Sequence, residues 1–112
     1  MMDFDEYEKL ARRTALLSEE SQALQLYDLG LGVAGETGEL AEKLKKMIRD
    51  DGGELTDERK EMMKREIGDV LWYLSQLSRV LGFKFSEAAE ANIKKLEDRM
   101  ARGVLKGSGD NR

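Results

Sequence analysis

Cysteine, histidine and proline are all absent from this 112-residue chain. The absence of cysteine excludes disulfides and thiolate metal sites, and it is compatible with a reducing compartment. The absence of histidine excludes imidazole bases, Zn–His sites and the Glu-x-x-His pattern of di-iron bundles. The absence of proline means that no ring geometry forces a helix to break. Any acid–base chemistry must therefore come from carboxylates, lysine, tyrosine or bound water.

Basic runs and long apolar stretches are also missing. The formal net charge is −4, and because no basic stripe is present to follow a phosphate backbone, a nucleic acid polymer is not an expected partner. The apolar stretches are short, whereas about 20 apolar residues are needed to cross a membrane. The first six residues, Met-Met-Asp-Phe-Asp-Glu, are acidic and unlike a secretory signal. We therefore expect a cytoplasmic protein without a membrane partner.

The chain is instead rich in charge and in helical periodicity. Charged residues make up 38% and hydrophobic residues 40% of the sequence, a balance typical of a folded helical protein rather than a disordered one. At this length we expect one domain with a modest core. Apolar spacing predicts helices over residues 3–17, 22–49, 57–81 and 87–102. We therefore predict an all-α, four-helix bundle-like fold in a single domain, residues 1–102, followed by a glycine-rich, irregular tail, residues 103–112.

Capping residues indicate where these helices begin and end. A bend or cap is expected at residues 18–21, Ser-Glu-Glu-Ser, and a turn at residues 50–55, Asp-Asp-Gly-Gly-Glu-Leu. Thr56 is expected to cap the third helix, because acidic residues follow it in the first turn. Gly82 should end that helix, and Ser86 should cap the fourth.

Apolar stripes run along the predicted helices and are expected to form the core. The strongest stripe belongs to the third helix, and the fourth helix carries a shorter one that should face inward. Their members are Ile67, Val70, Leu71, Leu74, Leu77 and Leu81 on the third helix, and Ala89, Ile93, Leu96 and Met100 on the fourth. Because four short helices with thin stripes make a small core, we also expect homo-oligomerisation.

Two carboxylate pairs, Glu36-x-x-Glu39 and Glu66-x-x-Asp69, lie inside the second and third helices. Residues three positions apart in a helix differ by about 60° in direction and ~4.5 Å in height, so each pair presents its carboxylates side by side. If the two helices pack together, the four acids converge, and each like-charged pair at ~4 Å repels by ~4 kcal/mol at a dielectric of ~20. Oxygen-only ligands suit Mg²⁺ or Mn²⁺. The alternative is an ordinary solvated face of a charge-rich helix.

A third polar group lies on the fourth helix. Asn92, Lys95 and Arg99 occupy positions i, i+3 and i+7, within about 60° of arc beside the apolar stripe. Lysine supplies a point charge and arginine a bidentate fork, so this basic arm suits an anion. Pairing of the two cations with glutamates on the same helix is the alternative. An acidic cluster next to a basic arm is the arrangement expected for a metal-bound polyphosphate.

Glycines are frequent just before the first carboxylate pair. Residues 30–35, Gly-Leu-Gly-Val-Ala-Gly, match the dinucleotide fingerprint G-x-G-x-x-G. That motif requires a preceding strand in a βαβ unit, and no strand is predicted here, so we reject it. Two explanations remain open: Gly35 and Gly38 thin the helix so that a backbone or ligand can approach, or the helix breaks at the first two glycines.

Two aromatic residues, Trp72 and Tyr73, follow the second carboxylate pair. Either ring is able to stack on a nucleotide base, because every base presents a π-face. An aromatic side chain on a helical stripe is more often part of the core, so this alternative also stays open.

Residues 30–112 resemble the MazG-like branch of the all-α nucleoside triphosphate pyrophosphohydrolases. The matching segments are Gly-Glu-Thr-Gly-Glu-Leu-Ala-Glu at 35–42, Glu-Ile-Gly-Asp-Val-Leu-Trp-Tyr-Leu at 66–74 and Asn-Ile-Lys-Lys-Leu-Glu-Asp-Arg at 92–99. The glycine-rich ending at 107–112 is similar to that of small phage and bacterial members. Either carboxylate pair alone is unspecific, but both pairs in this order, followed by Asn-x-x-Lys-Leu-x-x-Arg, are specific. Residues 1–29 match only as helix.

The resemblance implies hydrolysis of an NTP or dNTP to NMP and pyrophosphate, with Mg²⁺ or Mn²⁺, in nucleotide house-cleaning or pool control. It implies metal ligands at Glu36, Glu39, Glu66 and Asp69, phosphate or sugar contacts at Asn92, Lys95 and Arg99, and a further phosphate contact at Lys43. Glu39 is the first candidate for the general base, with Glu36 as the second catalytic carboxylate and Glu42 as an alternative base. A homodimer or homotetramer is implied as well. The tail, with Lys106 and Arg112, is expected either to fold over the substrate or to be disordered.

Two other interpretations stay open. In the first, the chain is a non-catalytic helical interaction module, in which the leucine-rich third helix mediates assembly and the acids are solvated. This module would show no Mg²⁺-dependent rise in melting temperature. In the second, the substrate is phosphoribosyl-ATP, as in the histidine-pathway relatives. The glycine-rich tail and the Glu-Thr-Gly-Glu segment look less like that branch.

Overall fold

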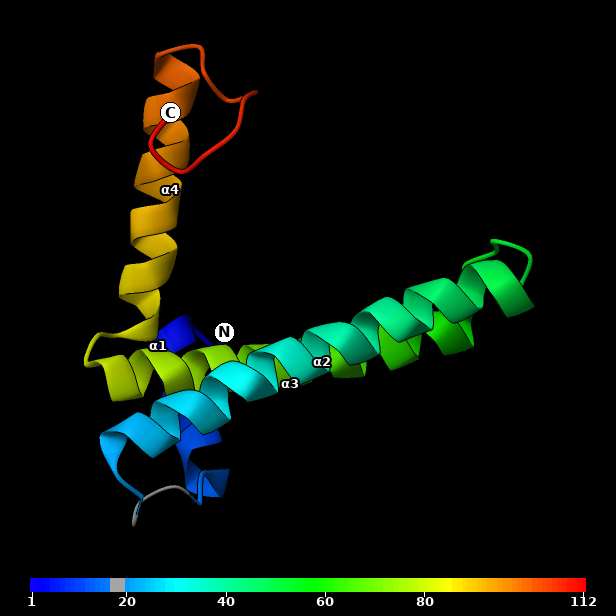
Figure 1. The fold of residues 1–112 in the computed structure, drawn as a ribbon, viewed down its shortest axis with the longest axis horizontal. Helices are drawn as coiled ribbons and strands as arrows, with labels where there is room; N and C mark the ends of the chain where they lie inside the picture. The colour runs from blue at the N-terminus through cyan, green and yellow to red at the C-terminus, as the bar shows by residue number, and fades with distance from the viewer. Residues whose placement is uncertain (17–19) are drawn as a thin grey trace.

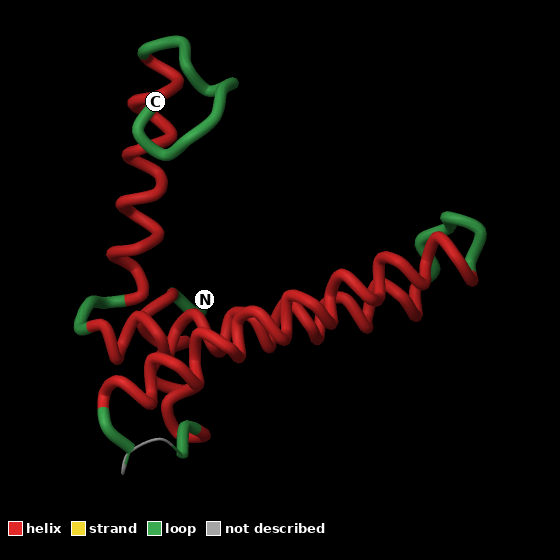
Figure 2. Tube along the Cα trace, viewed as in Figure 1, coloured by secondary structure: helices red, strands yellow, loops and turns green. Residues whose placement is uncertain are grey.

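A computed structural model describes residues 1–16 and 20–112 of the chain. The elements in order are α1 (Phe4–Ala11), a 3-10 turn (Arg12–Thr14), α2 (Gln22–Asp50), α3 (Asp57–Leu81) and α4 (Phe85–Ala101) (Figure 1). In this described part of the chain every regular element is helical, and Figure 2 shows only helices and loops. The predicted all-α class is therefore confirmed.

The helix ends follow local capping chemistry. The Ser21 side chain accepts a hydrogen bond from the Leu24 N–H at the start of α2. The Thr56 hydroxyl accepts one from the Arg59 N–H at 3.1 Å, and Gly82 ends α3 in the left-handed conformation with φ +90°. The predictions for Thr56 and Gly82 are confirmed. Of the bend predicted at residues 18–21, residues 18 and 19 lie outside the described part, as does residue 17 of the predicted first helix.

The prediction that Ser86 caps the fourth helix is wrong. The helix begins at Phe85, and the capping position is Lys84, whose side chain makes no capping hydrogen bond. The Ser86 N–H and hydroxyl instead donate to the Asp5 carboxylate at 3.0 and 2.7 Å. The Phe85 ring packs edge-on against Phe4, with ring centroids 5.2 Å apart. Contacts with α1, rather than a local cap, therefore fix the start of α4.

Helices α2 and α3 form a long antiparallel hairpin, closed by a turn in which Gly52 and Gly53 have φ values of +63° and +81° (Figure 1). Helix α1 lies against the end of this hairpin. The Trp72 indole N–H lies 3.2 Å from the Ala11 carbonyl and 2.9 Å from the Thr14 hydroxyl. The Gln76 amide donates to the Glu8 carbonyl at 3.3 Å. Polar side chains of α3 thus hold α1 in place.

The core of the single chain is small, and parts of the apolar stripes lie outside it. Ser75, Gln76 and Ser78 are buried on α3, whereas Leu81 of the predicted stripe is 51% exposed. The other exposed members of the two predicted stripes are Ile67, Leu74, Ile93, Leu96 and Met100. For these residues the expectation of an inward orientation is wrong within one chain. The reason is that α4 projects away from the hairpin instead of lying along it (Figure 1).

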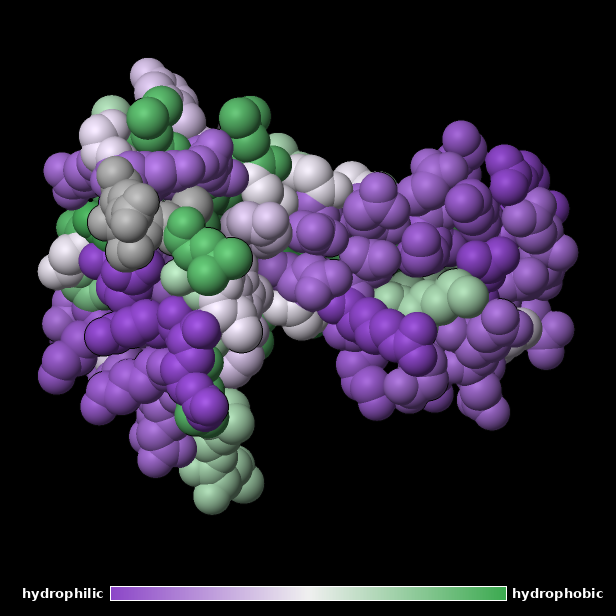
Figure 3. Space-filling view, turned by 90° about the horizontal axis from the view of Figure 1, so that it is seen from below, coloured by the Kyte–Doolittle hydropathy of each residue, from purple (hydrophilic) through white to green (hydrophobic). Residues whose placement is uncertain are grey.

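The molecule is extended for its length. Its radius of gyration is 17.0 Å, whereas about 13 Å is expected for a compact domain of this size. In Figure 3 the surface over the far end of the hairpin is mostly hydrophilic, and hydrophobic side chains gather where α1 meets the hairpin. Within the described residues, no helix combines the length and the apolar character needed to span a bilayer.

Candidate active site

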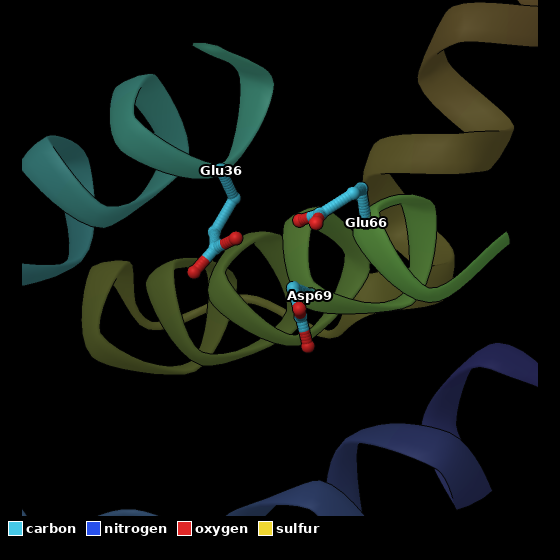
Figure 4. A group of neighbouring side chains, drawn as sticks. All are labelled: Glu36, Glu66 and Asp69. Carbon is cyan, nitrogen blue, oxygen red and sulfur yellow. The ribbon is translucent and has the colours of Figure 1, made fainter. Parts of the chain in front are cut away.

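Three of the four predicted acids meet between α2 and α3. Glu36 extends from α2 and Glu66 and Asp69 from α3, and each offers a carboxylate oxygen within 4.8 Å of the others. Figure 4 shows the Glu36 and Glu66 side chains turned toward one another from the two helices. The spacing of three residues between Glu66 and Asp69 brings both to the face of α3 that lies beside α2. We refer to Glu36, Glu66 and Asp69 as the acidic cluster.

The fourth predicted acid, Glu39, lies next to this cluster but outside it. Its side chain is 59% exposed, and its carboxylate is 3.9 Å from the Lys43 ammonium. Lys43 also lies 3.8 Å from Glu66. The Glu39 side chain is therefore more accessible to solvent than that of Glu66, which is 15% exposed.

Glu36 is the member of the cluster whose ionised form is disfavoured. The pKa of Glu36 is raised above its ordinary value of 4.5, first by desolvation and then by the neighbouring carboxylates of Asp69, Glu66 and Glu39. Because the ionised form is disfavoured in the folded chain, stability falls as the pH rises from 4.5 through the raised pKa. A cation bound at the cluster would reverse this effect, because it favours the ionised form.

The residues of the cluster fit a hard divalent cation. Carboxylate oxygens are the ligands of Mg²⁺ and Mn²⁺, and a metal–oxygen distance of ~2.1 Å allows ligand oxygens up to ~4.2 Å apart. The observed limit of 4.8 Å is close to that value, so small side-chain rotations would complete a common site. Lys43 offsets only part of the charge, because it contacts Glu66 alone within the cluster.

Two aromatic residues line the space on one side of the cluster. Trp72 and Tyr73, together with Glu36 and Asp69, line a hollow of about 350 Å³, which we call the aromatic hollow. The two rings meet edge to face, with centroids 5.0 Å apart. Trp72 and Tyr73 are therefore able both to pack against the rest of the chain and to contact a ligand. The Trp72 indole N–H bonds to Ala11 of α1 and to Thr14 of the 3-10 turn, while both aromatic side chains line the hollow next to the acids.

Gly32 lies where α2 contacts Tyr73 of α3, and the sequence alone did not distinguish it from the other glycines. A Cβ atom at this position would lie 2.2 Å from the Tyr73 ring, whereas at Gly35 and Gly38 it would meet nothing within 4 Å. Helix α2 is continuous through all of these glycines, which excludes the alternative of a helix break and agrees with the rejection of a dinucleotide loop. Only the pairing of α2 with α3 shows which glycine is needed for close approach.

Replacing Gly32 by alanine is expected to lower the free energy of unfolding by about 1–3 kcal/mol, because the added methyl group must displace the Tyr73 ring. Gly35→Ala is the matched control, since its Cβ enters open space. The control should be neutral or more stable by about 0.5–1 kcal/mol. Urea unfolding followed by circular dichroism measures both variants. Equal effects at the two positions would contradict the proposed packing.

Cationic side chains line the space on the other side of the cluster. A cleft of about 340 Å³ between α2 and α3 contains four cations and one acid of the cluster. Its lining consists of Lys43, Lys46, Arg59, Met62, Arg65 and Glu66. We refer to this set as the basic cleft. Lys43 was predicted as a phosphate contact, whereas Lys46, Arg59 and Arg65 were not singled out.

The basic arm of α4 lies apart from the acidic cluster within one chain. Helix α4 contacts α1 and the end of α3, and Lys95 and Arg99 line neither the aromatic hollow nor the basic cleft. Asn92 is exposed. The Lys95 ammonium and an Arg99 N–H bond to the Asp110 carboxylate at 2.8 and 3.1 Å, and Arg99 is only 5% exposed. The tail thus supplies the partner of the arm.

The tail itself folds back on α4. The Arg112 guanidinium donates to the Gly109 carbonyl at 2.6 Å and to the Val104 and Leu105 carbonyls at 3.2 Å. Arg102 donates to the Arg112 carbonyl at 2.6 Å. Figure 1 shows the tail returning alongside the last turns of α4. These contacts order the tail along α4, and the expectation that it folds over the substrate stays a prediction.

Replacing Asp110 by asparagine is expected to loosen the tail. The pKa of Asp110 is lowered by hydrogen bonds from Lys95 and Arg99, so the contact is present above the ordinary aspartate pKa and lost as the pH falls through the lowered value. Amide hydrogen exchange over residues 104–112 should become up to about fivefold faster. Asp57→Asn, at the start of α3, is the control. Unchanged exchange in Asp110→Asn would show that the contact does not order the tail.

These features define an all-α chain with a carboxylate cluster in a helical hairpin, flanked by aromatic and cationic side chains. A family model described as the MazG nucleotide pyrophosphohydrolase domain matches residues 25–103. The chain therefore belongs to the MazG family, as its sequence predicts. It is also similar to the Gene 37 protein of Mycobacterium phage L5, with 45% identity over 82 residues, which cover 73% of this chain and 72% of that protein. No solved structure gives a significant match.

Proposed function

We propose that this protein is a Mg²⁺-dependent nucleoside triphosphate pyrophosphohydrolase that converts an NTP or dNTP and water to NMP and pyrophosphate. The convergence of Glu36, Glu66 and Asp69 within 4.8 Å is the observation that carries the proposal. Membership of the nucleotide pyrophosphohydrolase family supports the same reaction class. The aromatic hollow and the basic cleft supply surfaces of opposite character on either side of the acids.

The acidic cluster would hold the Mg²⁺, or Mn²⁺ in its place, with Glu39 as an additional ligand or as the base. When bound, the ion would neutralise phosphate charge and acidify water. The carboxylates of Glu36, Glu66 and Asp69 would hold the ion at the seam of the hairpin, and the reacting α-phosphate would lie against it there. Desolvation and the neighbouring carboxylates raise the pKa of Glu36, and the repulsion among the carboxylates favours binding of a cation.

Glu39 is the first candidate for the general base. Its carboxylate is outside the cluster and largely exposed, so it is accessible to a water molecule. In the reaction, the water oxygen attacks the α-phosphorus, its proton passes to Glu39, and the bond to the bridging oxygen breaks so that pyrophosphate leaves. Glu36 is the second catalytic carboxylate, and Glu42, one turn further along α2, is the alternative base.

The basic arm is assigned to a site shared between chains of a homodimer or homotetramer. Two observations support assembly: the exposed apolar stripes of α3 and α4, and a radius of gyration larger than a compact domain requires. In such an oligomer Lys95, Arg99 and Asn92 of one chain would contact phosphate or sugar at the acidic cluster of another. The substrate anion would then take the place of the Asp110 carboxylate.

A substrate panel tests the proposed function. The full-length chain is incubated with the common NTPs, dNTPs and phosphoribosyl-ATP, with and without Mg²⁺, and pyrophosphate release is measured. We expect Mg²⁺-dependent release from at least one nucleoside triphosphate. Release of orthophosphate alone, or no turnover of any substrate, would contradict the proposal, and turnover of phosphoribosyl-ATP alone would indicate the histidine-pathway reaction.

A further inference from the structure

The basic cleft is a concentration of positive charge on a chain whose formal net charge is −4. Four cations and a single carboxylate line it. Helical spacing explains why these side chains converge. Lys43 and Lys46 are three positions apart on α2, and Arg59, Met62 and Arg65 are separated by three positions each on α3, so each set shares one side of its helix.

Two of the four cations are already paired with acids. Lys43 lies 3.9 Å from Glu39 and 3.8 Å from Glu66. Arg59 bonds to Asp51 at 2.8 Å and lies 3.8 Å from Asp50. Among the residues that the structure describes, Lys46 and Arg65 have no carboxylate within 4.0 Å. The cleft therefore retains positive charge that an anion would neutralise.

The cleft is continuous with the acidic cluster. Glu66 belongs to both, and Lys43 contacts it at 3.8 Å. On α3 the order toward the turn of the hairpin is Trp72, Asp69, Glu66, Met62 and Arg59. The rise of 1.5 Å per residue places Met62 about 6 Å beyond Glu66. An elongated ligand whose middle lies at the acids therefore has an aromatic surface at one end and a cationic surface at the other.

We propose that the basic cleft binds the pyrophosphate portion of the substrate, its β- and γ-phosphates, and retains it as the product pyrophosphate. This inference rests on the proposed function and gives the substrate a direction: the nucleoside faces Trp72 and Tyr73, and the leaving group points toward the turn of the hairpin. Lys46 and Arg65 supply the charges, because in the described part of the chain neither has a carboxylate within ion-pair distance. The basic arm of α4 is then left to contact the α-phosphate or the sugar.

A pair of double variants tests the assignment. Lys46→Gln with Arg65→Gln removes two charges from the cleft, and Lys45→Gln with Lys64→Gln removes the same charge from neighbouring exposed positions outside it. Binding of inorganic pyrophosphate to the full-length chain is measured by calorimetry at fixed free Mg²⁺. We expect the cleft variant to raise the Kd by about tenfold or more, and the control to change it less than threefold. Binding of NMP should be unaffected in both variants.

The inference is overturned if wild-type protein does not bind pyrophosphate, if both double variants weaken it equally, or if only Arg99→Gln weakens it. These outcomes are independent of turnover. If no nucleotide is hydrolysed while the cleft variant selectively loses pyrophosphate, the anion site stands and the proposed reaction fails. If nucleotides are hydrolysed while the cleft variant binds pyrophosphate normally, the reaction stands and the assignment of the cleft fails. Circular dichroism confirms that each variant is folded.

Discussion

Replacing Asp69 by asparagine is expected to lower kcat/KM for the best nucleoside triphosphate by about 10³-fold and to leave the helical content unchanged. Asparagine keeps the size of the side chain but removes one of the three negative charges of the acidic cluster. Loss of a charged group that acts on the transition state typically costs 10²–10³-fold in rate, and a weaker metal site adds to this loss. Steady-state kinetics over a series of Mg²⁺ concentrations measures the effect.

The fold gives little reason for Asp69→Asn to unfold the chain. The Asp69 side chain is exposed, and within the described residues it takes part in no ion pair. Glu61→Gln is the matched control, because Glu61 is an exposed acid on the same helix whose partner is Lys64. Near-wild-type activity of Asp69→Asn, or an equal loss in the control, would exclude a catalytic role of the cluster.

Thermal melting of the same variant separates an enzyme from a non-catalytic module. Mg²⁺ at about 100 times its Kd stabilises a folded protein by about 2.7 kcal/mol, which is roughly 10 °C for a chain of this size. We expect the wild type to show this rise and Asp69→Asn to lose most of it. Without metal, the variant should melt slightly higher than wild type, because one source of charge repulsion is gone. An unchanged wild-type melting temperature would favour the interaction module.

The parts of the fold that depend on neighbouring residues follow from the sequence. Thr56 and Gly82 were placed correctly because capping hydrogen bonds and a left-handed turn involve residues only a few positions apart. Helical periodicity also places Glu66 and Asp69 on one face of α3, whereas their meeting with Glu36 was predicted only on the condition that α2 and α3 pack together.

Features that depend on the relative placement of helices were missed. Gly32 cannot be distinguished from the other glycines until the Tyr73 ring lies against it. Ser86 suits a helix cap in the sequence, but its hydroxyl bonds to Asp5, 81 positions away. The cationic residues of the basic cleft come from two helices, and no local spacing relates Lys46 to Arg65. Apolar periodicity, finally, does not say whether the surface that covers a stripe belongs to the same chain or to another.

If two chains share each site, a mixture of two inactive variants is expected to regain activity. Asp69→Asn lacks an acid of the cluster and Arg99→Gln lacks a charge of the basic arm, so each alone should be almost inactive. If α4 of one chain completes the site of its partner, co-expression of the two variants should restore about a quarter of the wild-type activity in a dimer. Half of the dimers are then mixed, and each mixed dimer has one site with both groups intact. The restored activity should co-purify with the mixed species.

A variant that prevents assembly tests whether the restored activity depends on contact between two chains. Leu81→Glu places a charge on the exposed stripe of α3, where the leucine is 51% exposed in the single chain. It should reduce the mass in sedimentation to that of one 12.7 kDa chain and abolish the restored activity. Leu55→Glu, in the exposed segment before α3, is the control and should leave the assembly intact. If Arg99→Gln alone is fully active, or if an oligomer forms without restoring activity in the mixture, the basic arm does not serve the acidic cluster of a neighbouring chain.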